Sequence, residues 1–192
     1  MMNEELKPWQ VQRTRLLLDC SPWFRVMADD LLLPGGRQVE NYYRIEALDF
    51  VMIFPLAEDG RVLALRGYKH GPGRVMLQLP AGYLDRPGES PLACARRELF
   101  EETGHAADEW RPLGSLSVDG NRGMGRAYMF LARGLHSVAP PDAGDLETLV
   151  VRWLSLDELR RLWRAGQFDN TTATALIGLA LDTLRDSDWR QG

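Results

Sequence analysis

The chain has little cysteine, no long apolar run and no excess of positive charge. Only two of its 192 residues are cysteines, Cys20 and Cys94, which argues against a disulfide framework and is typical of the reducing cytoplasm. No stretch is long and apolar enough to span a bilayer, so no membrane association is predicted. The net charge of -4 gives no electrostatic reason to expect nucleic-acid binding.

The composition is that of a globular protein, with 45% hydrophobic and 26% charged residues. Helices are predicted at 90–103, 155–166 and 171–185, from their caps and helical periodicity. Apolar runs bounded by turn signals predict strands at 11–19, 22–33, 38–46, 49–56, 61–68, 75–79, 111–118, 126–132 and 148–154. This order favours an α+β or layered α/β/α domain, with a loop at 137–146.

The helix after Ser90 carries three glutamates, Glu98, Glu101 and Glu102. Spacings of three and four place their side chains on one face of the helix. Three carboxylates on one face repel one another, and a hard divalent cation such as Mg²⁺ or Mn²⁺ would remove that repulsion. Acidic clusters on helices are more often only solvated faces, so the three glutamates by themselves leave both interpretations open.

A longer pattern surrounds these glutamates. The segment Leu79-Pro-Ala-Gly82, then Glu89, then Arg97-Glu-Leu-Phe-Glu-Glu-Thr-Gly104 resembles the signature of the Nudix hydrolases. Every specified position from Glu89 to Gly104 matches. Two departures are present: six residues instead of five separate Gly82 from Glu89, and the last apolar position is occupied by His105.

The resemblance implies a role for each matching position. Glu98, Glu101 and Glu102 would hold Mg²⁺ or Mn²⁺, with the main-chain carbonyl of Ala81 completing the shell, and Glu101 and Glu102 would serve catalysis. The remaining positions would be structural, with Glu89 and Arg97 bracing the loop against the helix as a charge pair. These structural positions are Gly82, Glu89, Arg97 and Gly104.

Three flanking segments, 65–70, 153–158 and 166–170, are similar to the branch of the family that cleaves ADP-ribose and nucleoside-diphosphate sugars. This likeness implies that Lys69 contacts a substrate phosphate and that Glu147 acts as catalytic base or extra metal ligand. A solvated lysine and an ordinary loop glutamate are the alternatives. Asn121 and Arg122 lie in a glycine-rich turn and either bind substrate or shape a hairpin.

The resembled branch implies a Nudix-type α/β/α sandwich with a mixed sheet, plus a small N-terminal antiparallel β subdomain. Residues 1–46 would form the subdomain and pair across a homodimer, and 47–192 would form the Nudix domain. Trp23 and Tyr43 are candidates to contact the base of the substrate, although such aromatics more often serve core or interface packing.

We therefore expect Mg²⁺-dependent hydrolysis of a nucleoside diphosphate derivative, ADP-ribose or another nucleotide sugar, to a nucleoside monophosphate and a sugar phosphate. One alternative is a hydrolase of damaged nucleoside triphosphates or dinucleoside polyphosphates. A second is a nucleotide-sugar sensor that has lost catalysis, and the intact glutamate set argues against it.

Overall fold

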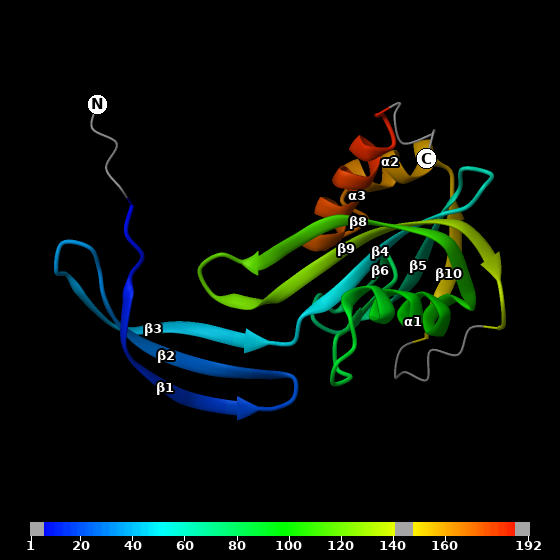
Figure 1. Ribbon diagram of the computed structural model, residues 1–192. Coiled ribbons are helices and arrows are strands. Elements are labelled where there is room, and N and C mark those ends of the chain that lie inside the picture. Colours follow the sequence, from blue (N-terminus) through cyan, green and yellow to red (C-terminus); the bar gives the residue numbers. More distant parts are fainter. Residues whose placement is uncertain (1–5, 141–147, 187–192) are drawn as a thin grey trace, which may run out of the picture. The chain divides into compact units, whose positions relative to one another are not determined.

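The computed structural model describes residues 6–140 and 148–186 (Figure 1). They form two compact units, one containing the chain up to Leu48 together with Ser117–Arg126, the other Asp49–Leu116 and the chain from Ala127. The elements are β1 (Gln10–Cys20), β2 (Phe24–Leu32), β3 (Gln38–Ala47), β4 (Phe50–Leu56), β5 (Val62–Lys69), β6 (Arg74–Gln78), β7 (Ala81–Tyr83), α1 (Pro91–Thr103), β8 (His105–Asp119), β9 (Gly123–Ser137), β10 (Val150–Leu154), α2 (Leu156–Arg164) and α3 (Thr171–Thr183).

The first unit is an antiparallel meander of β1, β2 and β3 joined to the β8–β9 turn. The start of β9 pairs with β3, where the amide of Ile45 donates to the carbonyl of Arg122 at 2.7 Å. Gly123 makes this approach possible: with a φ of 90°, a Cβ there would lie 2.8 Å from the carbonyl oxygen of Ile45. Glycine adopts this backbone conformation without steric cost.

The second unit is built on a mixed sheet in which β4 is central. It pairs parallel with β9, from Phe50 with Ala127 to Leu56 with Arg133, and antiparallel with β5 and β7. The order continues from β5 to β10, while β6 also pairs with β5 and β8 with β9. A strand that is apolar on both faces, as β4 is, belongs in the middle of a sheet that is covered on both sides.

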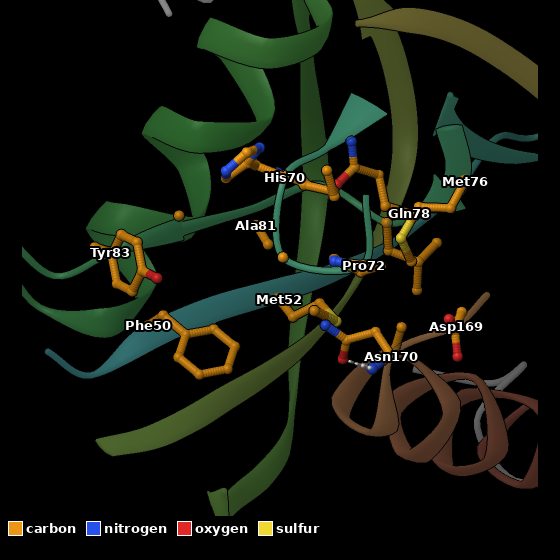
Figure 2. A pocket seen from close by; sticks show the side chains of 15 residues that line it. Phe50, Met52, His70, Pro72, Met76, Gln78, Ala81, Tyr83, Asp169 and Asn170 are labelled. Atoms are coloured by element: carbon orange, nitrogen blue, oxygen red, sulfur yellow. Dashed lines mark hydrogen bonds between the residues drawn. The ribbon is translucent and has the colours of Figure 1, made fainter. Parts of the chain in front are cut away.

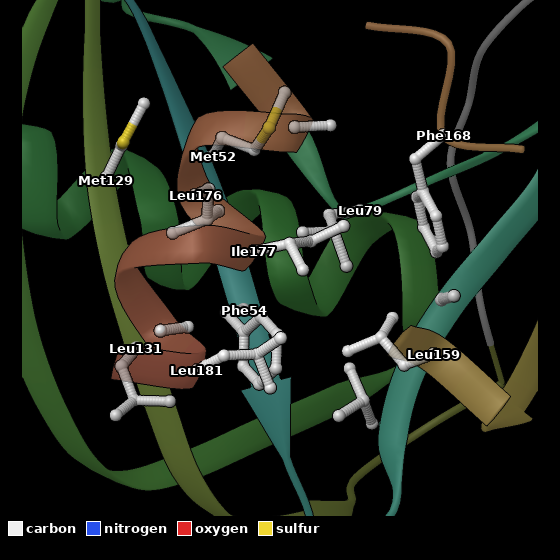
Figure 3. Close-up of a cluster of buried hydrophobic side chains, with 14 of the residues drawn as sticks. Met52, Phe54, Leu79, Met129, Leu131, Leu159, Phe168, Leu176, Ile177 and Leu181 are labelled. Atoms are coloured by element: carbon white, nitrogen blue, oxygen red, sulfur yellow. The ribbon is translucent and has the colours of Figure 1, made fainter. Parts of the chain in front are cut away.

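Helices cover both faces of this sheet, because alternate side chains of β4 enter two different cores. Met52 and Phe54 pack with Leu176 and Ile177 of α3 (Figure 3). Val51 and Ile53 pack on the other side with α1, through its residues Cys94, Ala95 and Leu99. Figure 1 shows α1 on one face of the sheet and α2 and α3 on the other. The predicted α/β/α architecture with a mixed sheet is thus confirmed.

The predicted helices agree with the structure, but two strands are longer than the sequence pattern indicated. The prediction of 111–118 corresponds to β8, which begins at His105, and 126–132 corresponds to β9, which extends over Gly123–Ser137. The start of β8 is rich in alanine and acidic residues, which have low strand propensity, and pairing with β9 overrides that preference. The three-residue strand β7 was not predicted.

Within residues 6–140 and 148–186, the helices all fall short of the length and hydropathy that crossing a bilayer requires.

Candidate active site

Helix α1 begins and ends where the local sequence requires. Ser90 is in an extended conformation and its hydroxyl accepts from the amide of Ala93 at 3.2 Å, and Pro91 occupies the first turn. Gly104 ends the helix in the left-handed conformation, with a φ of 69°, and donates its amide to the carbonyl of Phe100 at 2.8 Å. These caps fix the rotation of the helix and therefore the face on which its glutamates lie.

The three predicted metal ligands lie on the half-buried face of α1. The side chain of Glu98 is 13% exposed and that of Glu101 is 34% exposed. Glu102 accepts from the main-chain amide of Ala81 at 3.0 Å, which brings the start of β7 against the helix. The structure therefore gathers Ala81, Glu98, Glu101 and Glu102 around one loop–helix junction.

Arg97 is the counter-charge at the centre of this face. Its guanidinium donates to both carboxylate oxygens of Glu89 at 3.0 Å, to Glu98 at 2.5 Å and to Glu101 at 3.0 Å. It also donates to the carbonyl of Tyr83 at 3.3 Å, so it joins the helix to β7. Hydrogen bonds from Arg97 lower the pKa of Glu89, and those to Glu89 raise the pKa of Arg97. This geometry agrees with the bracing role predicted for the pair.

The pKa of Glu98 is shifted in the opposite direction to that of Glu89. Burial raises the pKa of the Glu98 carboxyl group, and the nearby charge of Arg97 only partly opposes that effect. A Cβ on Gly82 would lie 1.8 Å from the carboxyl carbon of Glu98. With Glu98 in this orientation, only glycine at position 82 leaves room for its carboxylate against β7.

The donor set fits a hard divalent cation by its chemistry, since it consists of carboxylate and main-chain oxygens. In the described part of the chain, no three His, Cys, Asp or Glu side chains are already gathered around a common point. Glu98 and Glu101 are instead turned toward Arg97, and Arg86 donates to the second oxygen of Glu101 at 3.1 Å. Side-chain rotations at these positions would present the same oxygens to a cation, which would also offset the repulsion among the carboxylates.

A cavity of about 500 Å³ opens beside this junction. Ala81 and Gly82 belong to its lining, as does Lys69 at the end of β5. Figure 2 shows Phe50 and Tyr83 on one side of it, with their ring centroids 6.2 Å apart, and Asp169 and Asn170 near the start of α3. The remaining lining residues are Met52, His70, Gly71, Pro72, Met76, Gln78, Leu79 and Ala173.

The polar side chains of the cavity differ in whether they already form hydrogen bonds or ion pairs within the protein. Asn170 caps α3 by accepting from the amides of Thr172 and Ala173. Asp169 forms an ion pair with Arg74 of β6. The amide nitrogen of Gln78 is buried without a hydrogen-bond partner. Apolar walls with a few polar groups are the usual lining of a site for a small molecule.

Sequence reasoning missed most of these lining residues. Phe50, Met52 and Met76 are strand residues whose pattern predicts only a buried sheet, and Asn170 reads as a helix cap. Neither signal separates a cavity wall from ordinary core. The cavity arises because β4, β5 and the segment before α3 meet in space.

The other predicted site residues lie in the first unit or outside the described residues. Trp23 and Tyr43 are 60% and 49% exposed. Arg122 donates to the carbonyl of Tyr43 at 2.9 Å, and the amide of Asn121 donates to Asp119 at 2.7 Å, so both residues shape the β8–β9 turn. Glu147 falls outside the described residues. Substrate contacts by Trp23, Tyr43, Asn121 and Arg122 stay predictions, and so does the catalytic role of Glu147.

His105 occupies the position where the Nudix signature has an apolar residue. Its ring packs edge-on against Trp153 with centroids 5.5 Å apart, and one ring nitrogen lies 2.7 Å from the carbonyl of Thr103. The imidazole therefore fills the apolar position with a partly buried aromatic face, and this departure leaves the end of the helix intact.

Comparisons with known proteins agree with this geometry. The family model for the NUDIX domain matches residues 48–175. The chain is 30% identical over 175 residues to an ADP-ribose pyrophosphatase of Mycobacterium tuberculosis, covering 86% of this chain and 84% of that protein. It is 26% identical over 161 residues to a methanol dehydrogenase activator of Bacillus methanolicus, covering 82% and 85%.

A solved structure shows the same fold. The crystal structure of an ADP compounds hydrolase superimposes with a TM-score of 0.84 at 24% identity, covering 95% of this chain and 97% of that one. Enzymes of the Nudix family generally need divalent metal ions. With the family model covering most of the chain and the box residues gathered at one junction, the protein belongs to the Nudix family and is a Nudix pyrophosphohydrolase.

Proposed function

We propose that the protein is a cytoplasmic enzyme that hydrolyses the diphosphate linkage of ADP-ribose or another nucleoside-diphosphate sugar in the presence of Mg²⁺. The observation that carries this proposal is the junction of two features: the carboxylates of α1 contact Ala81 and approach Gly82, and both residues line the cavity. The names of two relatives, ADP-ribose pyrophosphatases of Mycobacterium tuberculosis and Bacillus subtilis, support the choice of substrate class.

The reaction adds one water across the phosphoanhydride. The oxygen of water bonds to one phosphorus, the bridging oxygen leaves with the other phosphate, and the products are a nucleoside monophosphate and a sugar phosphate. A bound Mg²⁺ or Mn²⁺ supplies charge compensation for the phosphates and lowers the pKa of the attacking water.

The residues of the chain would bind, orient and accept a proton in this reaction. Glu98, Glu101 and Glu102 would hold the cation. Lys69 would contact a phosphate oxygen as a point charge at the cavity wall. We assign Glu147 as the base that takes the proton of water, on the resemblance alone.

The lining of the cavity suits a nucleoside or sugar attached to the diphosphate. Phe50 and Met52 offer apolar faces, while Gln78 has a buried amide nitrogen that lacks a partner. A ligand with a flat apolar face and hydrogen-bonding edges would satisfy both kinds of surface. Inorganic diphosphate has no apolar face to cover Phe50 and Met52, so we expect it to be a poor substrate.

The test is turnover of a substrate panel by the purified protein with Mg²⁺ or Mn²⁺. The panel contains ADP-ribose, other nucleoside-diphosphate sugars, nucleoside triphosphates including oxidised ones, dinucleoside polyphosphates and inorganic diphosphate. We expect the highest kcat/KM for a nucleoside-diphosphate sugar, with the monophosphate and sugar phosphate identified by mass spectrometry. A higher kcat/KM for a triphosphate or dinucleoside polyphosphate would replace the proposal by that alternative. Binding of nucleotide sugars without any turnover would establish the sensor alternative.

We also propose that the β1–β3 sheet is a homodimerisation element. Three consecutive leucines of β1, Leu16, Leu17 and Leu18, are each about half exposed, at 51%, 50% and 49%. The pairing register of β1 shifts at Leu17, and the three leucines together present a contiguous apolar surface on the outermost strand of the sheet. Sedimentation equilibrium should give twice the monomer mass, and Leu17→Glu should reduce it to that of the monomer. A wild-type monomer at micromolar concentration would refute this assignment.

A further inference from the structure

Arg86 lies in the loop that departs from the Nudix signature. Six residues separate Gly82 from Glu89, where the signature has five, and Arg86 is one of them. Its guanidinium donates to one carboxylate oxygen of Glu101 at 3.1 Å. Arg97 donates to the other oxygen at 3.0 Å. Both oxygens of Glu101 are therefore engaged by arginines, although the proposed function assigns this carboxylate to a divalent cation.

The two arginines are held very differently. The side chain of Arg97 is 13% exposed and is fixed by a bidentate pair with Glu89. The side chain of Arg86 is 59% exposed and stands on a loop that contains Pro87 and Gly88. Ion pairs this exposed contribute little free energy because water solvates both partners almost as well. A cation that arrives at Glu101 would therefore displace Arg86 and leave Arg97 in place.

We propose that Arg86 is a built-in competitor for the metal site, occupying Glu101 in the metal-free protein and releasing it when a divalent cation binds. The inference rests on the proposed function, because it takes Glu101 as a metal ligand. The released guanidinium remains on the loop beside the site, where a diphosphate would bring negative charge. Arg86 thus lowers the affinity for the metal alone and favours loading of the metal together with the anionic substrate.

The test measures binding of Mn²⁺ alone, without nucleotide, from the electron paramagnetic resonance signal of the free ion. Arg86→Ala and Arg86→Gln remove the competing charge, and each should bind Mn²⁺ about two- to fivefold more tightly than wild type, the range expected for one exposed ion pair. Arg86→Lys keeps the charge and should stay close to wild type. The gain should shrink in 0.5 M KCl, because salt screens exposed charges.

Arg96→Ala is the matched control. Arg96 is exposed on helix α1 and lies about 140° around the axis from Glu101, at 100° per residue. The substitution therefore removes an equal charge from a side chain that does not contact the carboxylate of Glu101. We expect it to change the affinity less than either Arg86 variant. Equal gains from Arg96→Ala and Arg86→Ala, or no gain from Arg86→Ala, would overturn the inference. The substrate panel tests the proposed function separately, because the Mn²⁺ titration contains no substrate.

Discussion

Two carboxylates, Asp29 of β2 and Glu98 of α1, are both mostly buried beside an arginine, yet their pKa values are shifted in opposite directions. Asp29 is 5% exposed and accepts from Thr14 at 2.7 Å and from Arg44 at 2.5 Å. Burial raises the pKa of Asp29, but these hydrogen bonds outweigh it, and the net effect lowers the pKa. For Glu98 burial prevails and the pKa is raised.

The pKa difference arises because Asp29 accepts from two donors, whereas Glu98 accepts from Arg97 alone. Glu98 also lies near the negative charges of Glu101 and Asp85, which raise its pKa further. Arg44 donates to Asp29 and Glu46, whereas Arg97 donates to Glu89, Glu98 and Glu101. Asp29 also has a neutral hydroxyl donor of its own. A buried carboxylate with two donors stabilises the fold, and one whose single donor is a guanidinium shared with other carboxylates retains capacity for a further cation. We therefore expect Asp29 to matter for stability and Glu98 for activity.

The largest effect is expected for Glu98→Gln. An amide cannot supply the charge that a divalent cation requires, and losing several kcal/mol of charge stabilisation corresponds to a fall in kcat of about 10³-fold or more. Steady-state kinetics on the best substrate of the panel would measure it. Glu109→Gln, at an exposed position on β8, is the control and should retain wild-type kcat. Wild-type kcat in Glu98→Gln would show that the metal assignment is wrong.

Asp29→Asn should have the opposite effect to Glu98→Gln. It should leave the rate of the reaction unchanged and lower the stability of the fold. Neutralising the buried partner of this ion pair costs up to about 3 kcal/mol, because Arg44 then keeps only Glu46 as a counter-charge. The free energy of unfolding, from urea denaturation followed by circular dichroism, is the measurement. Asp30→Asn on the same strand, where the side chain is 27% exposed, should cost about 1 kcal/mol or less. Equal losses for the two variants would contradict the structural role of Asp29.

Gly82→Ala tests how closely β7 and the helix must approach. The added Cβ would collide with the carboxyl group of Glu98, so that side chain must move, and a displacement of about 1 Å at a site can cost about 10²-fold in rate. We expect that fall in kcat/KM, together with weaker Mn²⁺ binding. Gly120→Ala, where a Cβ meets open space, should change neither quantity. Unchanged Mn²⁺ binding in Gly82→Ala would separate Gly82 from the metal site.

The smallest predicted effect is the pH dependence of the Asp29 contribution. The pKa of Asp29 is lowered in the folded protein, so its stabilisation is fully present above the unfolded-state pKa, about 3.9, and is lost as the pH falls through the lower folded-state value. The difference in unfolding free energy between wild type and Asp29→Asn should therefore be constant from pH 7 to about 5 and shrink below about 4. A difference that grows on acidification would have the wrong sign for a carboxyl group with a lowered pKa.

Much of helix α1 was predictable from local sequence, because the signals that define it act over a few residues. Ser90 and Gly104 fix where the helix starts and stops, and helical spacing alone places Glu98 and Glu101 on one face. The family signature extends over the same short segment. The strand ends of β8 and β9 were not predictable, since pairing between them extends both strands beyond what their local propensity supports.

The sequence by itself thus determined the Nudix family, the carboxylate helix and the Glu89–Arg97 brace, because each depends on residues near in the chain. Only the tertiary structure decided that Gly82 makes room for Glu98, that Arg86 engages Glu101, and that Phe50, Gln78 and Asn170 share one cavity. Those neighbours are brought together by sheet pairing and helix packing, whose long-range contacts leave no local pattern in the sequence.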